Sequence, residues 1–383
     1  MIIITVLQIL CAILIGTVFF DFIHYALHRF MKAEHSVLKL LGKLHGVHHR
    51  FFPADLQIRK VWIKKNLLQH VFFEYCMTLS GIVLCLLIFS SSIVVMAGFL
   101  ETCLFGSIVF SQGLDFHHRS LGSLKPYRGG VFVSTQYHAM HHVYPNHFYG
   151  SYIKLVDYLF GTALPLAGKH IVMTGAHGAL GSNLLHFLKK EGAHITALQY
   201  GVDYQYDNYQ RCDNALKTAD ILLLAHGTKH DHTQEANCDS YVYFIEQLKR
   251  LQPQRFVPLE IWAVGSEIEC HPCFGIKKLY PYAQSKRNFA KFARNYFYDD
   301  TIQYRHLVHS AFTSRMGPGL MSAKFAAWIT LFLLKRGFKY IPVTYTGFAW
   351  LNYLLFFNAG LPRLGRELWE RSSQIVKLRI LSK

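Results

Sequence analysis

The chain has 383 residues, enough for about two domains that each bury a core. Its net charge of +17 would suit nucleic acid, but 51% of the residues are hydrophobic and lie in long runs, so an anionic lipid surface is favoured and a nucleic-acid partner is excluded. The 8 cysteines are scattered, several of them within apolar runs, which excludes a disulfide framework.

Residues 1–20 form the first apolar run and carry no charged residue. As a helix the run would be about 30 Å long, which matches the hydrocarbon thickness of a bilayer. It lacks a basic start and a small-residue cleavage site, so it predicts a retained transmembrane helix rather than a signal peptide. Because Asp21 and a histidine pair follow directly, we expect a histidine site at the membrane surface.

Residues 29–70 are polar and basic, which by the positive-inside rule places them on the cytoplasmic side. Residues 71–110 are apolar and long enough for two spans with a turn near residues 90–92. Such a hairpin predicts a multi-pass membrane protein with its catalytic domains on the cytoplasmic face. Glu74 and Glu101 flank or interrupt the hairpin, where a buried carboxylate is costly, so we expect them near an interface or lining a polar cavity.

Three clusters of histidines have the spacing of one helix face, and their repetition favours metal binding over a structural or surface role, even in a chain with 23 His. The clusters are His24 and His28; His45, His48 and His49; and His138, His141 and His142. Either His117 or His118 could complete the metal shell, so the candidate ligands include His118. Asp21 or Asp157 could fix the tautomers of the imidazoles by accepting from them.

Residues 21–162 resemble the membrane fatty acid hydroxylase/sterol desaturase superfamily. The resemblance rests on Asp21, the three histidine clusters, Tyr149-Gly150 and Asp157-x-x-Phe160-Gly161-Thr162. It implies an oxygen-dependent di-iron site that hydroxylates or desaturates a lipid; the histidines alone would suit zinc as well as iron. Because no flavin, haem or iron–sulfur motif is visible, electrons must come from an external donor, of the ferredoxin or cytochrome b5 type. Phe148 stands where the family usually has Asn, and fewer spans are visible than in many members.

A short linker, residues 163–168, leads into an apolar β-branched run at residues 169–175. Gly175, Gly178 and Gly181 follow in a G-x-x-G-x-x-G pattern that opens a helix ending at Lys190. A glycine turn between a strand and a helix is typical of dinucleotide binding, because the backbone can approach a pyrophosphate at the helix N-terminus. Further strands at residues 195–199, 219–225 and 256–264 and a helix at residues 237–250 predict a Rossmann-like, doubly wound parallel sheet.

Tyr282 and Lys286 are one helical turn apart. A lysine at this distance is expected to lower the pKa of the tyrosine, which suits the phenol to exchange a proton with a carbonyl while hydride moves. From Lys169 to Arg315 the chain resembles the short-chain dehydrogenase/reductase family. The resemblance implies that Tyr282 is the general acid/base and Lys286 its activator, and it assigns these further roles: Ser266 positions the carbonyl, Asn237 belongs to the proton relay, and Thr313 binds the cofactor amide.

The second predicted strand ends at Gln199, where an NAD enzyme would carry an acidic residue, so NADP is favoured over NAD. Apolar runs at residues 325–334 and 348–357 are too short to span a membrane. They are expected to pack on the sheet or to lie in the membrane interface, and the chain is expected to end on the membrane.

The sequence therefore predicts an α-helical membrane domain (residues 1–162), the linker, and an α/β domain (residues 169–383) with membrane-associated C-terminal helices. The whole resembles fusions described as bifunctional sterol desaturase/short-chain dehydrogenase. This resemblance implies a membrane enzyme in which di-iron oxidation of a fatty acyl, sterol or other lipid is coupled to NAD(P)-dependent alcohol/carbonyl interconversion. Two alternatives are an aldehyde-deformylating, alkane-forming enzyme and a non-catalytic metal-binding membrane scaffold.

Overall fold

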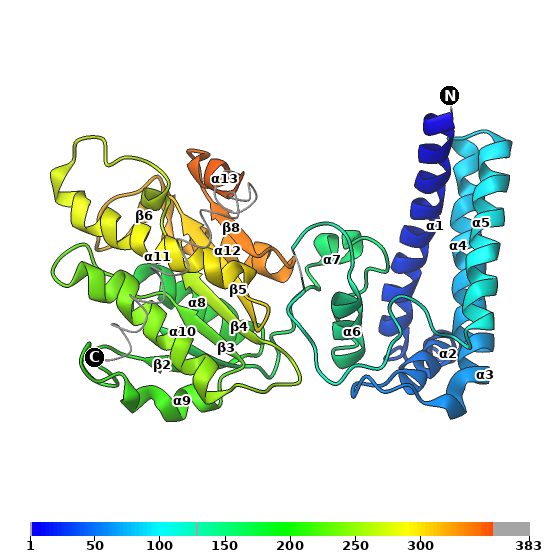
Figure 1. Cartoon of the computed structure of the whole chain (residues 1–383), viewed down its shortest axis with the longest axis horizontal. Coiled ribbons are helices and arrows are strands. Elements are labelled where there is room, and N and C mark those ends of the chain that lie inside the picture. Colours follow the sequence, from blue (N-terminus) through cyan, green and yellow to red (C-terminus); the bar gives the residue numbers. More distant parts are fainter. Residues whose placement is uncertain (1, 128, 355–383) are drawn as a thin grey trace, which may run out of the picture. The chain divides into compact units, whose positions relative to one another are not determined.

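The computed structural model describes residues 2–127 and 129–354. The chain divides into two compact units, Met1–Pro165 and Leu166–Lys383, and the division falls within the predicted linker (Figure 1). Each unit has a hydrophobic core of its own.

The first unit is helical. Its helices are α1 (Ile2–Phe30), α2 (Ser36–Phe51), α3 (Ile63–Asn66), α4 (Phe72–Leu84), α5 (Ser91–Phe110), α6 (Thr135–Val143) and α7 (Leu155–Phe160). Three helical segments of the described chain are long and apolar enough to cross a membrane: Ile2–Phe30, Lys60–Leu87 and Ser91–Phe110. The first is longer than predicted, because no glycine or proline interrupts the helix beyond Phe20. The first histidine pair therefore lies on the last turns of α1 itself.

Two glycines let α1 and α4 pack backbone to backbone. A Cβ on Gly81 would lie 2.8 Å from Cα of Gly16, and a Cβ on Gly16 would lie 2.6 Å from the carbonyl oxygen of Thr78. Small residues allow this close approach in helical membrane bundles, where van der Waals packing holds helices together. Gly42 plays the same part between α2 and the end of α1, since its Cβ would lie 2.6 Å from the nitrogen of Met31. These contacts bring the histidine-bearing faces of α1 and α2 together.

The second unit is built on a six-stranded parallel sheet, so the predicted Rossmann-like fold is confirmed. The strands are β1 (His170–Thr174), β2 (His194–Leu198), β3 (Ile221–Leu224), β4 (Leu259–Val264), β5 (Ile302–His309) and β8 (Tyr340–Val343), in the order β2-β1-β3-β4-β5-β8. The order reverses between β1 and β3. In doubly wound sheets, ligands bind outside the carboxyl ends of the strands at this reversal.

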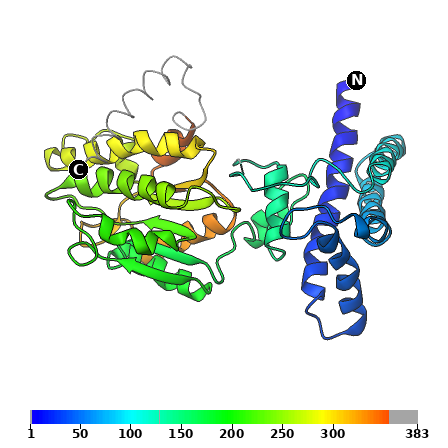
Figure 2. The same ribbon diagram turned by 60° about the horizontal axis from the view of Figure 1, so that its bottom comes forward.

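The helices of the second unit lie in two layers. They are α8 (Ala179–Lys190), α9 (Asp213–Lys217), α10 (Ser240–Leu251), α11 (Tyr280–Tyr298), α12 (Ala323–Lys335) and α13 (Phe348–Asn352). α8 packs against α12, whereas α10 packs against α11, the yellow-green and yellow helices that run side by side in Figure 2. The short pair β6 (Phe312–Thr313) and β7 (Met321–Ser322) lies between β5 and α12 in the sequence.

The sequence predicted the sheet only as far as β4. β5 was missed because its buried face includes Arg305, whose charge is compensated by an ion pair with Glu260 on β4. β8 was missed because it is short and contains Pro342. The predicted run at residues 325–334 is confirmed as a helix packed on α8 and β8. Residues 355–357 of the second run, and the predicted membrane-bound end of the chain, lie outside the described residues.

Candidate metal centre and nucleotide site

The structure gathers the candidate histidines into two adjacent groups. In each group, one ring nitrogen from every member lies within 4.8 Å of those of the others. The first group is His24, His28, His45, His49 and His141, and the second is His48, His118, His138 and His142. All nine histidines that the sequence singled out belong to one group or the other. Of the alternatives His117 and His118, only His118 is in a group.

Each H-x-x-H-H motif contributes histidines to both groups rather than to one. α2 directs His45 and His49, which are one turn apart, to the first group and the intervening His48 to the second. α6 does the reverse, since His141 joins the first group while His138 and His142 join the second. Two helices therefore bridge both positions, which holds the groups side by side.

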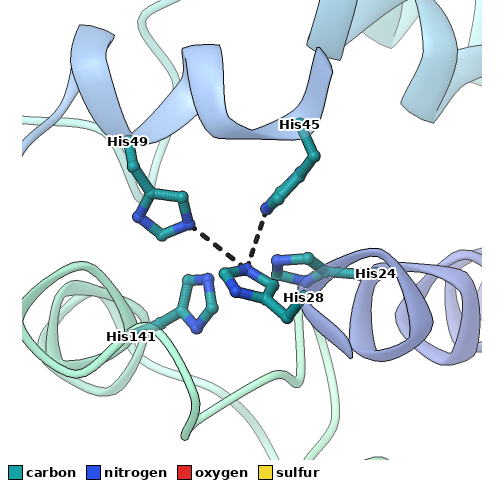
Figure 3. A group of neighbouring side chains, drawn as sticks. All are labelled: His24, His28, His45, His49 and His141. Atoms are coloured by element: carbon teal, nitrogen blue, oxygen red, sulfur yellow. Dashed lines mark hydrogen bonds between the residues drawn. The ribbon is translucent and has the colours of Figure 1, made fainter. Parts of the chain in front are cut away.

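The first group is built around His28. Its Nε2 lies 2.9 Å from Nε2 of His45 and 3.3 Å from Nε2 of His49. Figure 3 shows these rings and those of His24 and His141 converging from α1, α2 and α6. Within residues 2–127 and 129–354, both ring nitrogens of His24 are buried without a hydrogen-bond partner, and so is Nε2 of His141. Orphaned buried nitrogens are costly unless something absent from the polypeptide binds them.

In the second group, the tautomers of two histidines are fixed by hydrogen-bond acceptors that lie outside the group. Nδ1 of His118 lies 2.9 Å from both carboxylate oxygens of Asp115, and Nδ1 of His142 lies 2.6 Å from the carbonyl oxygen of Phe52. Carboxylate and carbonyl oxygens only accept, so Nδ1 of each ring carries the hydrogen. Nε2 of each neutral ring then presents a lone pair to the centre of the group.

These lone pairs meet one another. Nε2 of His118 is 3.1 Å from Nε2 of His48 and 3.1 Å from Nε2 of His138, which in turn lies 3.3 Å from Nε2 of His142. Ring nitrogens that all accept cannot satisfy each other at these distances, whereas a cation at the centre would satisfy every one. His141 behaves alike in the first group, because its Nδ1 donates to the carbonyl oxygen of His147 at 2.8 Å and leaves Nε2 free. The residues present therefore fit two metal ions with nitrogen ligands.

Burial keeps the rings in the form that binds metal. Removal from water lowers the pKa of His45, His48, His49, His138 and His142 well below the ordinary value, and neighbouring histidines lower it further. Burial also lowers the pKa of His141, to about 4. The rings are consequently neutral at physiological pH, as metal ligation requires.

Asp21 and Asp157 do not have the role expected of them. Asp157 accepts from the backbone nitrogens of Tyr149 and Gly150 at 2.9 and 3.0 Å, and from the hydroxyls of Tyr137 and Thr162 at 2.8 and 2.5 Å. Asp21 accepts from the backbone and hydroxyl of Ser151. Both carboxylates therefore fasten the loop after α6 to the helices that carry the histidines, and the tautomers are fixed by other groups.

Three residues of this region were not predicted. Asp115 orients His118, and its place in the same short Asp-Phe-His-His segment could have revealed it. Asn66 lies 3.3 Å from Nδ1 of His48, and the His70 ring stacks on that of His48 with 3.8 Å between centroids. Neither Asn66 nor His70 has a motif around it, so only the fold identifies them.

In the second unit, the three predicted glycines form the turn between β1 and α8. Gly175 has a φ of +72°, and a Cβ there would lie 2.5 Å from the backbone of Ala225. Gly178 begins α8 without any side-chain cap, so the first backbone N–H groups of a twelve-residue helix are left for a ligand. These features fit a dinucleotide pyrophosphate.

We expect Gly181→Ala to disrupt this turn, because the new Cβ would lie 2.0 Å from the carbonyl oxygen of Gly175. A backbone atom cannot move aside cheaply, so the expected loss of stability is about 1–3 kcal/mol, accompanied by weakened NADP(H) binding. Thermal unfolding and nucleotide fluorescence titration would measure the two effects. Ser182→Ala, at the exposed next position, is the matched control. Unchanged stability and affinity in Gly181→Ala would contradict the packing argument.

The predicted dehydrogenase residues lie at the carboxyl ends of the strands or on helices behind them. Ser266 follows β4 and shares a side-chain hydrogen bond with Tyr282 of α11. Lys286, one turn further along, donates from Nζ to the carbonyl oxygen of Val264 at 2.9 Å. Asn237 contacts the Ser285 hydroxyl at 3.1 Å rather than Lys286. A phenol, a hydroxyl and an ammonium group thus surround the end of β4.

The expected lowering of the Tyr282 pKa is wrong for this structure. Burial raises the pKa of Tyr282, and only the Ser266 hydrogen bond opposes the increase. Burial also lowers the pKa of Lys286 to about 8. An ammonium group that the prediction missed, that of Lys229, lies 5.6 Å from the centre of the Tyr282 ring. Thr313 lies in β6, where its hydroxyl donates to the carbonyl oxygen of Gly319 at 3.0 Å.

Known proteins resemble both parts of the chain. A family model described as "Fatty acid hydroxylase" matches residues 13–162. The monoglucosyldiacylglycerol epimerase of Synechocystis sp. is 27% identical over 260 residues, which cover 60% of this chain and 62% of that protein. The chain therefore spans less than two thirds of this relative's length.

The solved structures that resemble the chain include short-chain dehydrogenases. One, from Burkholderia cenocepacia in complex with NADP, has a TM-score of 0.42 and 15% identity, and the match covers 50% of this chain and 95% of that one. The Pseudomonas aeruginosa RhlG/NADP complex has a TM-score of 0.40 and 17% identity, with 48% and 99% covered.

Proposed function

We propose that the first unit is a di-iron lipid oxygenase, because a family model described as "Fatty acid hydroxylase" matches residues 13–162. The observation that carries the proposal is the pair of adjacent histidine groups whose lone pairs converge. Two bound irons would supply the activation of oxygen that an unreactive C–H bond requires and that no side chain can provide. The choice of iron over zinc follows from the family, since imidazole binds both.

The polypeptide's own part in this reaction is to orient the ligands. Asp115 and the carbonyl oxygens of Phe52 and His147 hold three of the rings with Nε2 directed inward. Losing one such supporting contact typically lowers metal affinity or activity by roughly 10–100-fold. Electrons would come from an external ferredoxin or cytochrome b5 type donor, and the site would lie on the cytoplasmic face of the membrane with which the apolar helices associate.

For the second unit we infer an NAD(P)-dependent interconversion of an alcohol and a carbonyl, with NADP preferred. A bound nicotinamide would supply hydride transfer. Tyr282 would exchange a proton with the substrate oxygen, which the Ser266 hydroxyl would position. The Lys286 ammonium would activate Tyr282 and contact the ribose, Asn237 would belong to the proton relay, and Thr313 would bind the cofactor amide. The two units together would modify one lipid or two related lipids.

A second candidate for the second unit is epimerisation of a lipid hydroxyl. The similar Synechocystis protein is named for an epimerase of monoglucosyldiacylglycerol. Such a reaction removes and restores hydride at one carbon, so it would consume no net nucleotide. Net formation or consumption of NADPH with a purified lipid would therefore favour the dehydrogenase. Product formation with nucleotide present only in a small, catalytic amount would favour the epimerase.

We expect the purified full chain to contain about two iron ions and to change the lipid profile of an expressing host only when oxygen is supplied. Elemental analysis would give the metal content, and mass spectrometry of lipids from aerobic and anaerobic cultures would reveal the product. Long-chain alkanes as the product would instead favour the deformylating reaction. Protein without bound transition metal, or a lipid change independent of oxygen, would overturn the oxygenase.

A further inference from the structure

A cavity of about 350 Å³ lies within the first unit, between α1, α4, α5 and the histidine groups. Its lining includes His24 of the first group and His48, His118 and His138 of the second. The volume falls within the range of small-molecule sites. A molecule held in this cavity would therefore contact both metal positions.

The carboxyl groups of Glu74 and Glu101 also line this cavity, as does that of Asp115, which confirms for the two glutamates one of the two positions expected of them. Glu101 is the more unusual, because it lies near the middle of the 20-residue helix α5. At 1.5 Å per residue it is about 14–15 Å from either end of a segment that is long and apolar enough to span a bilayer. An ionisable side chain at such a depth is expensive, and it marks a functional site with a partner.

Glu101 has no such partner among the residues that the structure describes. The half-buried Glu101 side chain forms no hydrogen bond or ion pair with any residue that the structure describes, whereas the buried acids of this unit, Asp21 and Asp157, are hydrogen-bonded several times over. Glu74 on α4 has one contact, with Nε2 of His70 at 3.4 Å. The carboxyl groups thus face the cavity with most of their hydrogen-bonding capacity unused.

Four hydroxyl groups of α4 and α5 near Glu101 donate to other acceptors. Ser107 donates to the carbonyl oxygen of Leu104 at 2.7 Å, and Ser111 donates to that of Ser107 at 2.8 Å. Thr102 donates to the carbonyl oxygen of Gly98 at 2.7 Å, so the Tyr75 hydroxyl, 3.0 Å away, donates to Thr102. These four hydroxyl protons are directed to other acceptors in α4 and α5, which leaves the Glu101 carboxyl available to a ligand in the cavity.

We propose that the cavity takes a lipid that carries a hydroxyl group within the bilayer, and that this hydroxyl pairs with Glu101, with Glu74 close by. The inference rests on the proposed oxygenase function and names its substrate class. A hydroxyl both donates and accepts, so it satisfies a carboxyl group in either protonation state. A purely hydrocarbon chain would leave the carboxyl unpaired, and an ammonium group would bring a second costly charge into the bilayer.

The test compares two probes of equal chain length, stearyl alcohol and octadecane, as competitors of tritiated stearyl alcohol on the full chain in phosphatidylcholine nanodiscs. Wild-type protein is expected to prefer the alcohol about tenfold, the effect of one hydrogen bond to a carboxyl group. Glu101→Leu should bind both probes alike, and Glu101→Gln, whose amide also donates and accepts, should keep most of the preference. Glu34→Leu makes the same change at an exposed position and should have no effect.

Glu101→Leu replaces a polar group by an apolar one within a span, so it should fold, and thermal unfolding checks this. Equal affinity of wild-type protein for the two probes, or a preference that survives Glu101→Leu, would overturn the inference. Metal content is measured on the same samples. Bound metal without alcohol preference refutes the substrate class and leaves the oxygenase standing, whereas alcohol preference without bound metal refutes the oxygenase.

Discussion

Replacing His141 by alanine is expected to remove about one of two metal ions and to reduce oxygen-dependent product by roughly 100-fold or more, because loss of a ligand should exceed the effect of losing one supporting contact. His141 is completely buried in the first group, and its Nδ1 is held by the carbonyl oxygen of His147. Its Nε2 has no hydrogen-bond partner among the described residues, so it is left for a metal. Elemental analysis and lipid mass spectrometry of the purified variant would measure both losses.

His117→Ala is the matched control, since His117 neighbours His118 but belongs to neither group. His118→Ala should lose metal from the second group, while His117→Ala should keep both ions. If the protein were a scaffold that keeps metal for stability, His141→Ala would fail to fold, and circular dichroism would show it. Wild-type metal content in a folded His141→Ala protein would contradict the assignment of this ligand.

The sequence predicted the members of the metal centre better than their arrangement. Spacing along a helix identified the histidines, because three and four residues bring side chains to neighbouring positions on one face. It could not show that His45 and His48 point to different groups, since that depends on where α1 and α6 meet α2. The groups that accept hydrogen bonds from the histidines are largely backbone carbonyls, such as that of Phe52. Every residue has such a carbonyl, so the residue type does not reveal this role.

The second unit shows the same limit. The glycine turn and the first strands were predictable because apolar runs and glycine positions are local features. β5 was not, because buried Arg305 is tolerated through partners far away in the sequence, the Glu260 carboxylate, 45 residues away, and the carbonyl oxygen of Phe338. The pKa of Tyr282 was predicted with the wrong sign for a related reason: burial depends on the whole fold, and here it outweighs the Ser266 hydrogen bond that lowers this pKa.

Replacing Tyr282 by phenylalanine is expected to reduce dehydrogenase turnover by about 100- to 10,000-fold, the usual contribution of a general acid/base, with little change in nucleotide affinity. The substitution removes one oxygen from a buried ring on α11 and leaves the glycine turn untouched. Rates with a lipid alcohol or aldehyde, together with NADPH fluorescence titration, would separate turnover from binding. Tyr280→Phe is the control, because that ring is 50% exposed on the same helix.

The pH dependence gives Tyr282 a second signature. Reduction of a carbonyl needs the protonated phenol, and oxidation of an alcohol needs the phenolate. Since burial raises the pKa of Tyr282, the phenol stays protonated through the neutral range. Carbonyl reduction should therefore be nearly constant around neutral pH and fall only in strong alkali, whereas alcohol oxidation should rise with pH throughout. Oxidation that levels off near neutral pH would show that the phenol ionises too easily for this environment, and identical profiles in wild type and Tyr282→Phe would exclude Tyr282 as the proton-transferring group.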